Sequence, residues 1–392
     1  MGLAGRDPIF FAQLDSETGS FHPDLYATVQ NTCLGCHGIE GQRQFAIDTA
    51  KPGSCPDFLR TIVDAIPYPA ARPESRYDGL ARDGISCEAC HHMVLGEADA
   101  ERYAKEPQNR CVAQRQEFLN PDNKLFARTF TGSFLVGDPD KLYGPFDDPK
   151  QTPMSHALGI VPEQSQTIKS SEICGTCHTV HLPVYEQHAP GANTTDEAKP
   201  IYYSYEQTTY PEWAFSAYRT GDAPEGKLPF GPGAVAQSCQ GCHMPSADAA
   251  KSVFRSKIAD IQELGNFFEA ENALPAADID LAVRTGFAKH QLVGLNVFLI
   301  QMAMKFYETL GIRTADPMLV ARGVPPLDLT KQTMLDQAAN ATATIAIDSL
   351  SRDTNELRAS VTITNKTGHK FPPASASAAP SSISRCSTLP TT

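Results

Sequence analysis

The sequence predicts a mainly α-helical and irregular fold with a small β module near its C-terminal end. Only 41% of the 392 residues are hydrophobic, and 30 Pro and 27 Gly indicate many turns. One five-residue motif with two cysteines and a histidine occurs four times. Beyond residue 336, apolar residues alternate with polar ones, which is the period of a β-strand.

The repeated motif reads Cys-x-x-Cys-His, the pattern of covalent haem attachment. Its thiols can add across the vinyl groups of a haem, and its His can bind the iron as the proximal ligand. Chance placement of the 11 Cys and 11 His would give on the order of 0.01 such matches. Zinc sites and redox Cys-x-x-Cys pairs would not explain the His after each second Cys. The four copies predict attachment through Cys33, Cys36, Cys87, Cys90, Cys174, Cys177, Cys239 and Cys242, with His37, His91, His178 and His243 as proximal ligands.

Four covalently attached c-type haems would change how the fold is built. Haems bring large, flat, apolar surfaces, so part of the core is cofactor and the polypeptide needs no conventional core of its own. We therefore expect residues 1–325 to form a multihaem cytochrome c fold, in which short helices and irregular segments wrap around stacked haems.

The net charge of −12 argues against a nucleic-acid partner, because phosphates need Lys and Arg contacts. It favours other redox proteins or cytochromes with cationic docking patches. The longest apolar run, Leu292 to Met304, contains Asn296 and Gln301 and is too short to cross a bilayer, so we expect no transmembrane segment. Haem is attached outside the cytoplasmic membrane, which predicts an exported protein, periplasmic or extracellular, whose export signal is not in this chain.

The N-terminal third holds one loosely helical segment, Asp7 to Tyr26, with Pro8 suited to a first helical turn. His22 precedes Pro23, and it suits either a surface turn or an axial position on a haem iron. Cys55 and Cys111 lie outside the motifs. A disulfide between them and two separate thiols both remain open, because sequence does not give their distance.

Three further histidines are candidate distal ligands. His92 adjoins the proximal His91, so it points elsewhere and can serve a different iron. His156 lies in the Pro- and Gly-rich stretch from Asp138 to Pro162, which we expect to be a loop that projects this side chain into a site. His181 follows His178 too closely to reach the same iron, but it can cap a neighbouring haem.

Two helices are expected after the fourth motif. Apolar residues recur at steps of three and four from Phe254 to Ala270. A second helix is expected over His290 to Leu310. His290 would then stand at a helix start, where the helix dipole helps to keep its imidazole neutral for metal binding.

The character of the chain changes after Pro325 and Pro326. Apolar residues alternate over residues 342–347 and 358–363, which predicts two strands with one buried face each. We place this partial β module at residues 336–372. Residues 373–392 lack apolar periodicity, and we expect a disordered or non-native tail there.

Several segments together resemble a family of large multihaem c-type cytochromes of exported bacterial and archaeal redox systems. They cover most of residues 5–372. They are VQNTCLGCHGIEGQRQ at 29–44, DGISCEACH at 83–91, residues 143–159 with PMSHALG, YEQTTYPEW, SCQGCHMP, and NKTGHKFP at 365–372.

The resemblance implies electron transfer through closely packed haems with His at both axial positions, and a C-terminal β domain. It marks four histidines as the best distal candidates, without deciding which serves which iron; they are His156, His181, His290 and His369. Family members usually continue upstream of a segment like residues 6–10 and continue after the HKFP segment with more strands. We therefore expect a chain that is a fragment at its N-terminus and whose last twenty residues come from a shifted reading frame or an interrupted gene, a hypothesis that reading the flanking DNA in all frames would test.

Three functions fit these observations. The leading one is an electron carrier with four closely packed, mostly bis-His haems, because a bis-His iron has no open position for substrate. The second is an oxidoreductase in which one open-coordination haem acts on nitrite, hydroxylamine or a similar small nitrogen compound. The third is a homo-oligomeric, polymeric conduit in which His22 or His369 is a distal ligand to a neighbouring chain.

Overall fold

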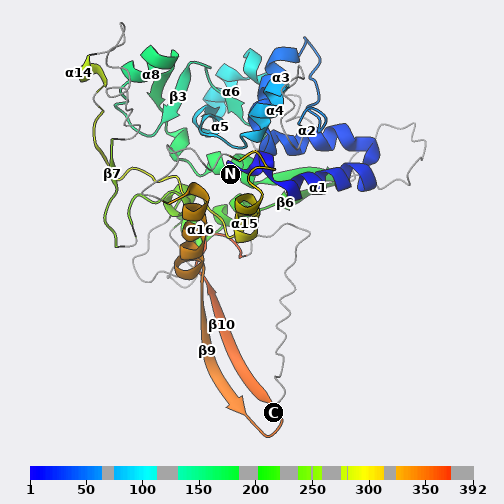
Figure 1. The fold of residues 1–392 in the computed structure, drawn as a ribbon, viewed down its shortest axis with the longest axis vertical. Coiled ribbons are helices and arrows are strands. Elements are labelled where there is room, and N and C mark those ends of the chain that lie inside the picture. The colour runs from blue at the N-terminus through cyan, green and yellow to red at the C-terminus, as the bar shows by residue number, and fades with distance from the viewer. Residues whose placement is uncertain are drawn as a thin grey trace.

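The computed structural model describes residues 1–63, 75–112, 131–184, 202–220, 237–248, 250–257, 275–279, 281–312 and 324–371. Short helices and irregular segments make up most of the body, and the hairpin of β9 and β10 projects away from it (Figure 1). The expected helix Phe254 to Ala270 lies outside these residues from position 258 on, as does the tail after Phe371.

The helices are short, and most belong to the first half of the chain. Their bounds are α1 Pro8–Ser16, α2 Tyr26–His37, α3 Ile39–Thr49, α4 Ser75–Arg82, α5 Cys87–His91, α6 Glu97–Tyr103, α8 Thr152–Leu158, α9 Glu172–His178, α10 Thr209–Ala214, α11 Ala217–Thr220, α12 Cys239–His243, α14 Ala276–Ile279, α15 Val297–Lys305 and α16 Pro326–Gln337.

The strands pair two by two. β3 and β4 are parallel and the other pairs are antiparallel. The pairs are β1 Met93–Val94 with β2 Leu135–Val136, β3 Lys141–Gly144 with β4 Val161–Gln164, β5 Val180–Val184 with β6 Tyr202–Gln207, β7 Arg255–Ser256 with β8 Arg284–Thr285, and β9 Ala343–Arg352 with β10 Leu357–Asn365.

The predicted helix near the N-terminus is confirmed as α1. The Asp7 side chain accepts hydrogen bonds from the backbone N–H groups of Ile9 and Phe10, and Pro8 occupies the first helical position. These local signals set where the helix begins. Phe11 and Leu14 then bury its inner face among the helices α2 and α4.

The segment from Asp138 to Pro162 is more ordered than the loop that we predicted. It contains β3, α8 and the start of β4. Pro153 lies in the first turn of α8, where its missing N–H costs nothing, and Gly159 ends the helix with a φ of 69°. In this segment Pro153 and Gly159 therefore mark the two ends of a helix, and they do not prevent one from forming.

Two helix predictions after the fourth motif were wrong in part. Phe254 to Lys257 is extended and includes β7, so no helix begins there. The helix expected over residues 290–310 is the shorter α15, because the Asn296 side chain accepts from the N–H of Leu299 and caps its start. His290 lies seven residues before α15 and receives no helix dipole.

The two C-terminal strands are confirmed as β9 and β10, but their expected buried faces are not. Nearly every residue of the hairpin is exposed. Asp336 and Gln337, which we placed in the β module, are the last residues of α16. That helix packs on α15 through Met334 and Ile300, so it joins the hairpin to the body.

Buried apolar side chains fall into small separate clusters within the described ranges. No helix in this part of the chain is long and apolar enough to cross a membrane. The largest fully buried side chains include Phe58, Phe134 and Leu34.

Cys55 and Cys111 form a disulfide, which settles the pairing that the sequence left open. Their sequence separation is 56 residues. A covalent link over that distance restricts the unfolded chain and stabilises the fold by about 4 kcal/mol in the chain-entropy model.

We predict that the double variant Cys55→Ser, Cys111→Ser unfolds at a clearly lower denaturant concentration than the wild type. The expected loss is about 4 kcal/mol of unfolding free energy. Denaturant titration followed by circular dichroism measures it. Addition of a thiol reductant should lower the wild-type midpoint and leave that of the variant unchanged; equal midpoints without reductant would contradict the prediction.

Candidate haem-binding sites

Each Cys-x-x-Cys-His motif is helical, and each of these helices ends at the histidine of its motif. Residues three and four apart lie on the same face of a helix, so both thiols and the imidazole of a motif share one face. Two of the short helices are capped by the preceding serine. Ser86 accepts from the N–H of Glu88, and Ser238 accepts from the N–H of Gly241.

Three proximal imidazoles are oriented by backbone carbonyls. The Nδ1 atoms of His37, His91 and His243 lie 3.4, 2.6 and 3.2 Å from the carbonyl oxygens of Ala4, Tyr143 and Val293. Donation from Nδ1 leaves the lone pair on Nε2, which is how metal-binding imidazoles are commonly held. The sequence did not point to these three carbonyls, because they are backbone groups far from the motifs.

Burial keeps these imidazoles in the form that binds a metal. Burial lowers the pKa of His37, His178 and His243. The nearby His243 lowers the pKa of His178 further, and His369 does the same for His243. Because these pKa values are lowered, the neutral form of each ring, which is the form that binds a metal, is favoured.

The third motif helix, α9, contacts the fourth motif directly. The N–H of Cys239 donates to the Ser171 hydroxyl over 3.0 Å. The Gln240 side chain donates to the Ser170 carbonyl over 2.8 Å. The thiols of Cys174 and Cys239 also hydrogen-bond, which lowers the pKa of Cys239 and raises that of Cys174. The first attachment thiols of two motifs therefore touch.

The same helix contacts the first motif through Gly132. The N–H of Gly132 donates to the Thr176 carbonyl over 2.8 Å. A Cβ atom on Gly132 would lie 3.1 Å from the Cys36 sulfur, and the residue has a φ of 70°. Only glycine meets both conditions without strain. Arg43 donates to the carbonyls of Gly132 and Phe134 and fixes this link.

The second motif meets α9 in an apolar cluster. Ala89 and Met93 are buried together with Ile173, and the sulfur atoms of Cys90 and Cys177 pack against this cluster. The Thr176 hydroxyl lies 3.7 Å from the Met93 sulfur. The helix α9 thus contacts the second and fourth motifs directly and is linked to the first through Gly132.

His290 faces the proximal ligand of the second motif. The ring centroids of His91 and His290 are 6.2 Å apart, with an interplanar angle of 26°. When two imidazoles bind one metal ion, their ring centroids are separated by two metal–nitrogen bonds of about 2 Å each plus the distance from each nitrogen to the centre of its ring, which gives a similar value. The Nδ1 of His290 lies 3.0 Å from the Ala288 carbonyl, so Nε2 carries the lone pair, as in His91. The separation of the two rings is similar to that of two imidazoles that would share one iron.

His369 is brought to the fourth motif by α10 and α11. The N–H of Lys370 donates to Glu212 over 2.8 Å, and the Tyr218 hydroxyl donates to the Lys366 carbonyl over 2.8 Å. The Trp213 indole N–H donates to the Gln237 carbonyl, two residues before Cys239. The segments YEQTTYPEW and NKTGHKFP, which the sequence analysis singled out separately, are therefore in contact.

The role of Tyr210 was missed from the sequence. Its ring packs on Gly175, where a Cβ atom would lie 2.8 Å from the ring. A glycine between the two cysteines of the third motif was the available signal for a close approach. Through this contact α10 holds α9 as well as the segment with His369.

His181 and His92 differ in how their surroundings hold them. His181 lies on β5 between the rings of Tyr203 and Tyr205, and its N–H donates to the Thr131 hydroxyl next to Gly132. This places its strand beside the first motif.

The Nε2 atom of His92 is buried without a hydrogen-bond partner, an arrangement that is costly for a protein and suits a metal ligand.

His156 and His22 are more peripheral. His156 is exposed on α8. The Nδ1 of His22 lies 2.6 Å from the Glu17 carboxylate. Neither position brings the ring against a Cys-x-x-Cys-His motif by a contact that the structure shows.

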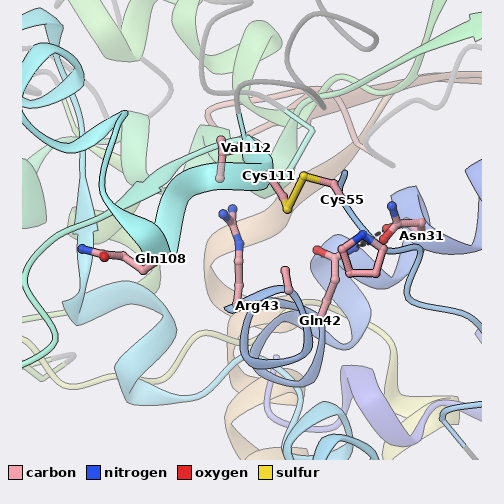
Figure 2. Close-up of a pocket in the computed structure, with 9 residues that line it drawn as sticks. Asn31, Gln42, Arg43, Cys55, Gln108, Cys111 and Val112 are labelled. Carbon is pink, nitrogen blue, oxygen red and sulfur yellow. Dashed lines mark hydrogen bonds between the residues drawn. A yellow bond between two sulfur atoms is a disulfide. The ribbon is translucent and has the colours of Figure 1, made fainter. Parts of the chain in front are cut away.

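A small cavity among the described residues lies away from these motifs. It has a volume of about 30 Å³, roughly the space of one water molecule. Asn31, Gln42 and Arg43 line it beside the Cys55–Cys111 disulfide (Figure 2). In the part of the chain that the structure describes, no group of three or more His, Cys, Asp or Glu is arranged to hold a metal ion. A haem iron needs at most two protein ligands.

No known protein identifies the chain. No family model matches it, and neither a curated protein nor a solved structure matches it. The case for a cofactor therefore depends on the residues themselves. The shared helix face of each motif, the carbonyl-held imidazoles and the orphaned Nε2 of His92 all fit c-type haem.

We predict that Gly132→Ala weakens the link between the first and third motifs. A Cβ atom there would crowd the Cys36 sulfur and force a residue with a side chain into a positive φ, at a cost of roughly 1–3 kcal/mol. Haem content of the purified protein, by mass spectrometry, should fall at the first motif. Gly144→Ala is the matched control, because nothing lies within 4 Å of its Cβ position; equal loss in both variants would contradict the prediction.

Proposed function

We propose that the protein transfers electrons between redox partners through four covalently attached c-type haems. The observation that carries this proposal is the position of α9, which contacts the second and fourth attachment motifs directly and is linked to the first through Gly132. Haems attached at motifs that touch one another would be close together. Closely packed haems pass electrons without a bound substrate.

When bound, a c-type haem supplies a one-electron redox centre. The chain holds it by two thioether bonds from each Cys-x-x-Cys pair and by the imidazole that follows. Carbonyl groups at Ala4, Tyr143 and Val293 keep three of these imidazoles in one tautomer and one orientation.

The distal positions are filled by histidines from other segments. His290 serves the second motif, since its ring faces His91. His369 is the candidate for the third or fourth motif, because α10 and α11 hold its segment next to the residues that precede Cys239. His181 lies beside the first motif, and the buried Nε2 of His92 is the candidate for the remaining iron. Two imidazoles on each iron leave no open position for substrate.

The contacts also suggest an order for electron flow. The third motif lies next to the other three, so electrons that pass between the other three haems would go through the haem of the third motif. An electron that enters near any other motif would then leave through a different one by way of His178 and its haem.

The proposed location is outside the cytoplasmic membrane. Covalent haem attachment takes place there, and the Cys55–Cys111 disulfide is of the kind that persists in an oxidising compartment. A chain with a net charge of −12 would dock on cationic patches of partner cytochromes or other redox proteins.

The oxidised, haem-loaded protein should show only low-spin haem by electron paramagnetic resonance and visible spectroscopy. This result is expected because two imidazoles per iron produce a strong ligand field and no vacant position. Nitrite and cyanide should leave the spectra unchanged. A high-spin signal that shifts with either ligand would instead indicate an enzyme acting on a small nitrogen compound.

We predict that His290→Ala keeps four attached haems and converts one of them to high spin. The variant removes one axial ligand but leaves both thioether bonds and His91 of the second motif in place. Mass spectrometry counts the haems and electron paramagnetic resonance reports the spin state.

Gln291→Ala is the control for this variant, because Gln291 is adjacent to His290 and only its backbone N–H forms a hydrogen bond, to the Lys289 carbonyl. It should remain fully low-spin. Retention of four low-spin haems in His290→Ala would exclude His290 as an axial ligand.

A further inference from the structure

The hairpin of β9 and β10 has one apolar face. In its antiparallel register Ile345 pairs with Ile363, and Ile347 pairs with Val361. Side chains of paired residues lie on the same face of a sheet, so these four aliphatic side chains form one continuous surface.

A β-bulge extends that surface toward the tip of the hairpin. The register shifts between Ser360 and Val361, after which Leu350 pairs with Ala359. Without the extra residue, Leu350 would pair with Arg358 and lie on the opposite face. Leu357 alternates in step with Ala359 and joins the same surface.

The apolar face is open. Its large side chains are between 52% and 72% exposed, and they are Ile345, Ile347, Leu350, Leu357, Val361 and Ile363. The other face carries Thr, Ser and Ala together with Arg358 and the Asp348 carboxylate, which accepts from the Thr362 hydroxyl, as expected of a sheet surface in water. An isolated two-stranded hairpin with such a face is marginally stable and needs a covering layer.

We propose that this face packs against the same face of a second copy of the chain, as two hairpins stacked in a small sandwich. Covering the six side chains in both copies would bury roughly 1,000 Å² in total. That area is typical of a weak, reversible interface, so dimerisation should depend on concentration. The matched length and identical chemistry of the two faces suit a two-fold symmetric contact.

Charge selects the relative orientation of the two copies. Arg352 pairs with Leu357 at the tip and lies on the apolar face. In an antiparallel stack the two Arg352 side chains are at opposite ends, whereas a parallel stack would bring them together. The hairpin is roughly 30 Å long and projects from the body (Figure 1). The whole chain has a net charge of −12, and an antiparallel stack separates the two bodies by more than a Debye length.

Sedimentation velocity of the whole haem-loaded protein, over a wide range of concentration, tests this proposal. The wild type should pass from one chain to two as concentration rises, and added salt should change dimerisation little, because the two bodies are already more than a Debye length apart. Ile347→Lys places a charge in the centre of the face and should weaken dimerisation by roughly tenfold or more.

Ala346→Lys is the matched control, because it adds the same charge to the opposite face of the same strand. It should dimerise like the wild type. Hydrogen exchange within residues 343–365 gives a second readout that does not depend on the variants, and it should slow as concentration rises. A single-chain mass at every concentration, equal dimerisation of both variants, or binding of the monomer to phosphatidylcholine vesicles through this face would overturn the proposal.

Discussion

The contacts of the third motif helix, α9, are the constraint on which the described structure most depends. The buried apolar clusters are small and separate, so no single core holds the helices together. Hydrogen bonds and close packing at α9 join segments that are far apart in sequence, from Gly132 on one side to Cys239 on the other. Each of these links lies at a cysteine motif, where haem would supply the missing apolar surface.

Polar groups around the motifs do more than stabilise the fold. A hydrogen bond of ordinary strength contributes about 1 kcal/mol, which is modest for a chain of this size. The same bond from Nδ1 of His91 to the Tyr143 carbonyl decides which ring nitrogen can bind a metal. The Nε2 atom of His92 differs from these groups, because it is buried and has no hydrogen-bond partner in the protein. The free-energy cost of burying this polar atom is therefore not offset by a hydrogen bond.

The C-terminal hairpin shows how a correct local prediction can fail at the level of packing. Alternation along residues 342–347 and 358–363 identified both strands, since the period of two is a property of the strand itself. Alternation also implied a buried face, but burial requires another layer. In the described chain Ile345 and Ile347 meet none and remain exposed. The bulge that keeps Leu350 in phase with them was not visible in the sequence, because it depends on the pairing register.

The sequence alone determined the local features. Residue spacing defined the Cys-x-x-Cys-His motifs, and Asp7 and Pro8 marked the start of α1, because attachment chemistry and helix capping act over a few residues. Tertiary structure decided what meets across long separations: the Cys55–Cys111 disulfide and the opposition of His91 and His290. Periodicity carries no information on such distances, since they depend on how separate elements pack.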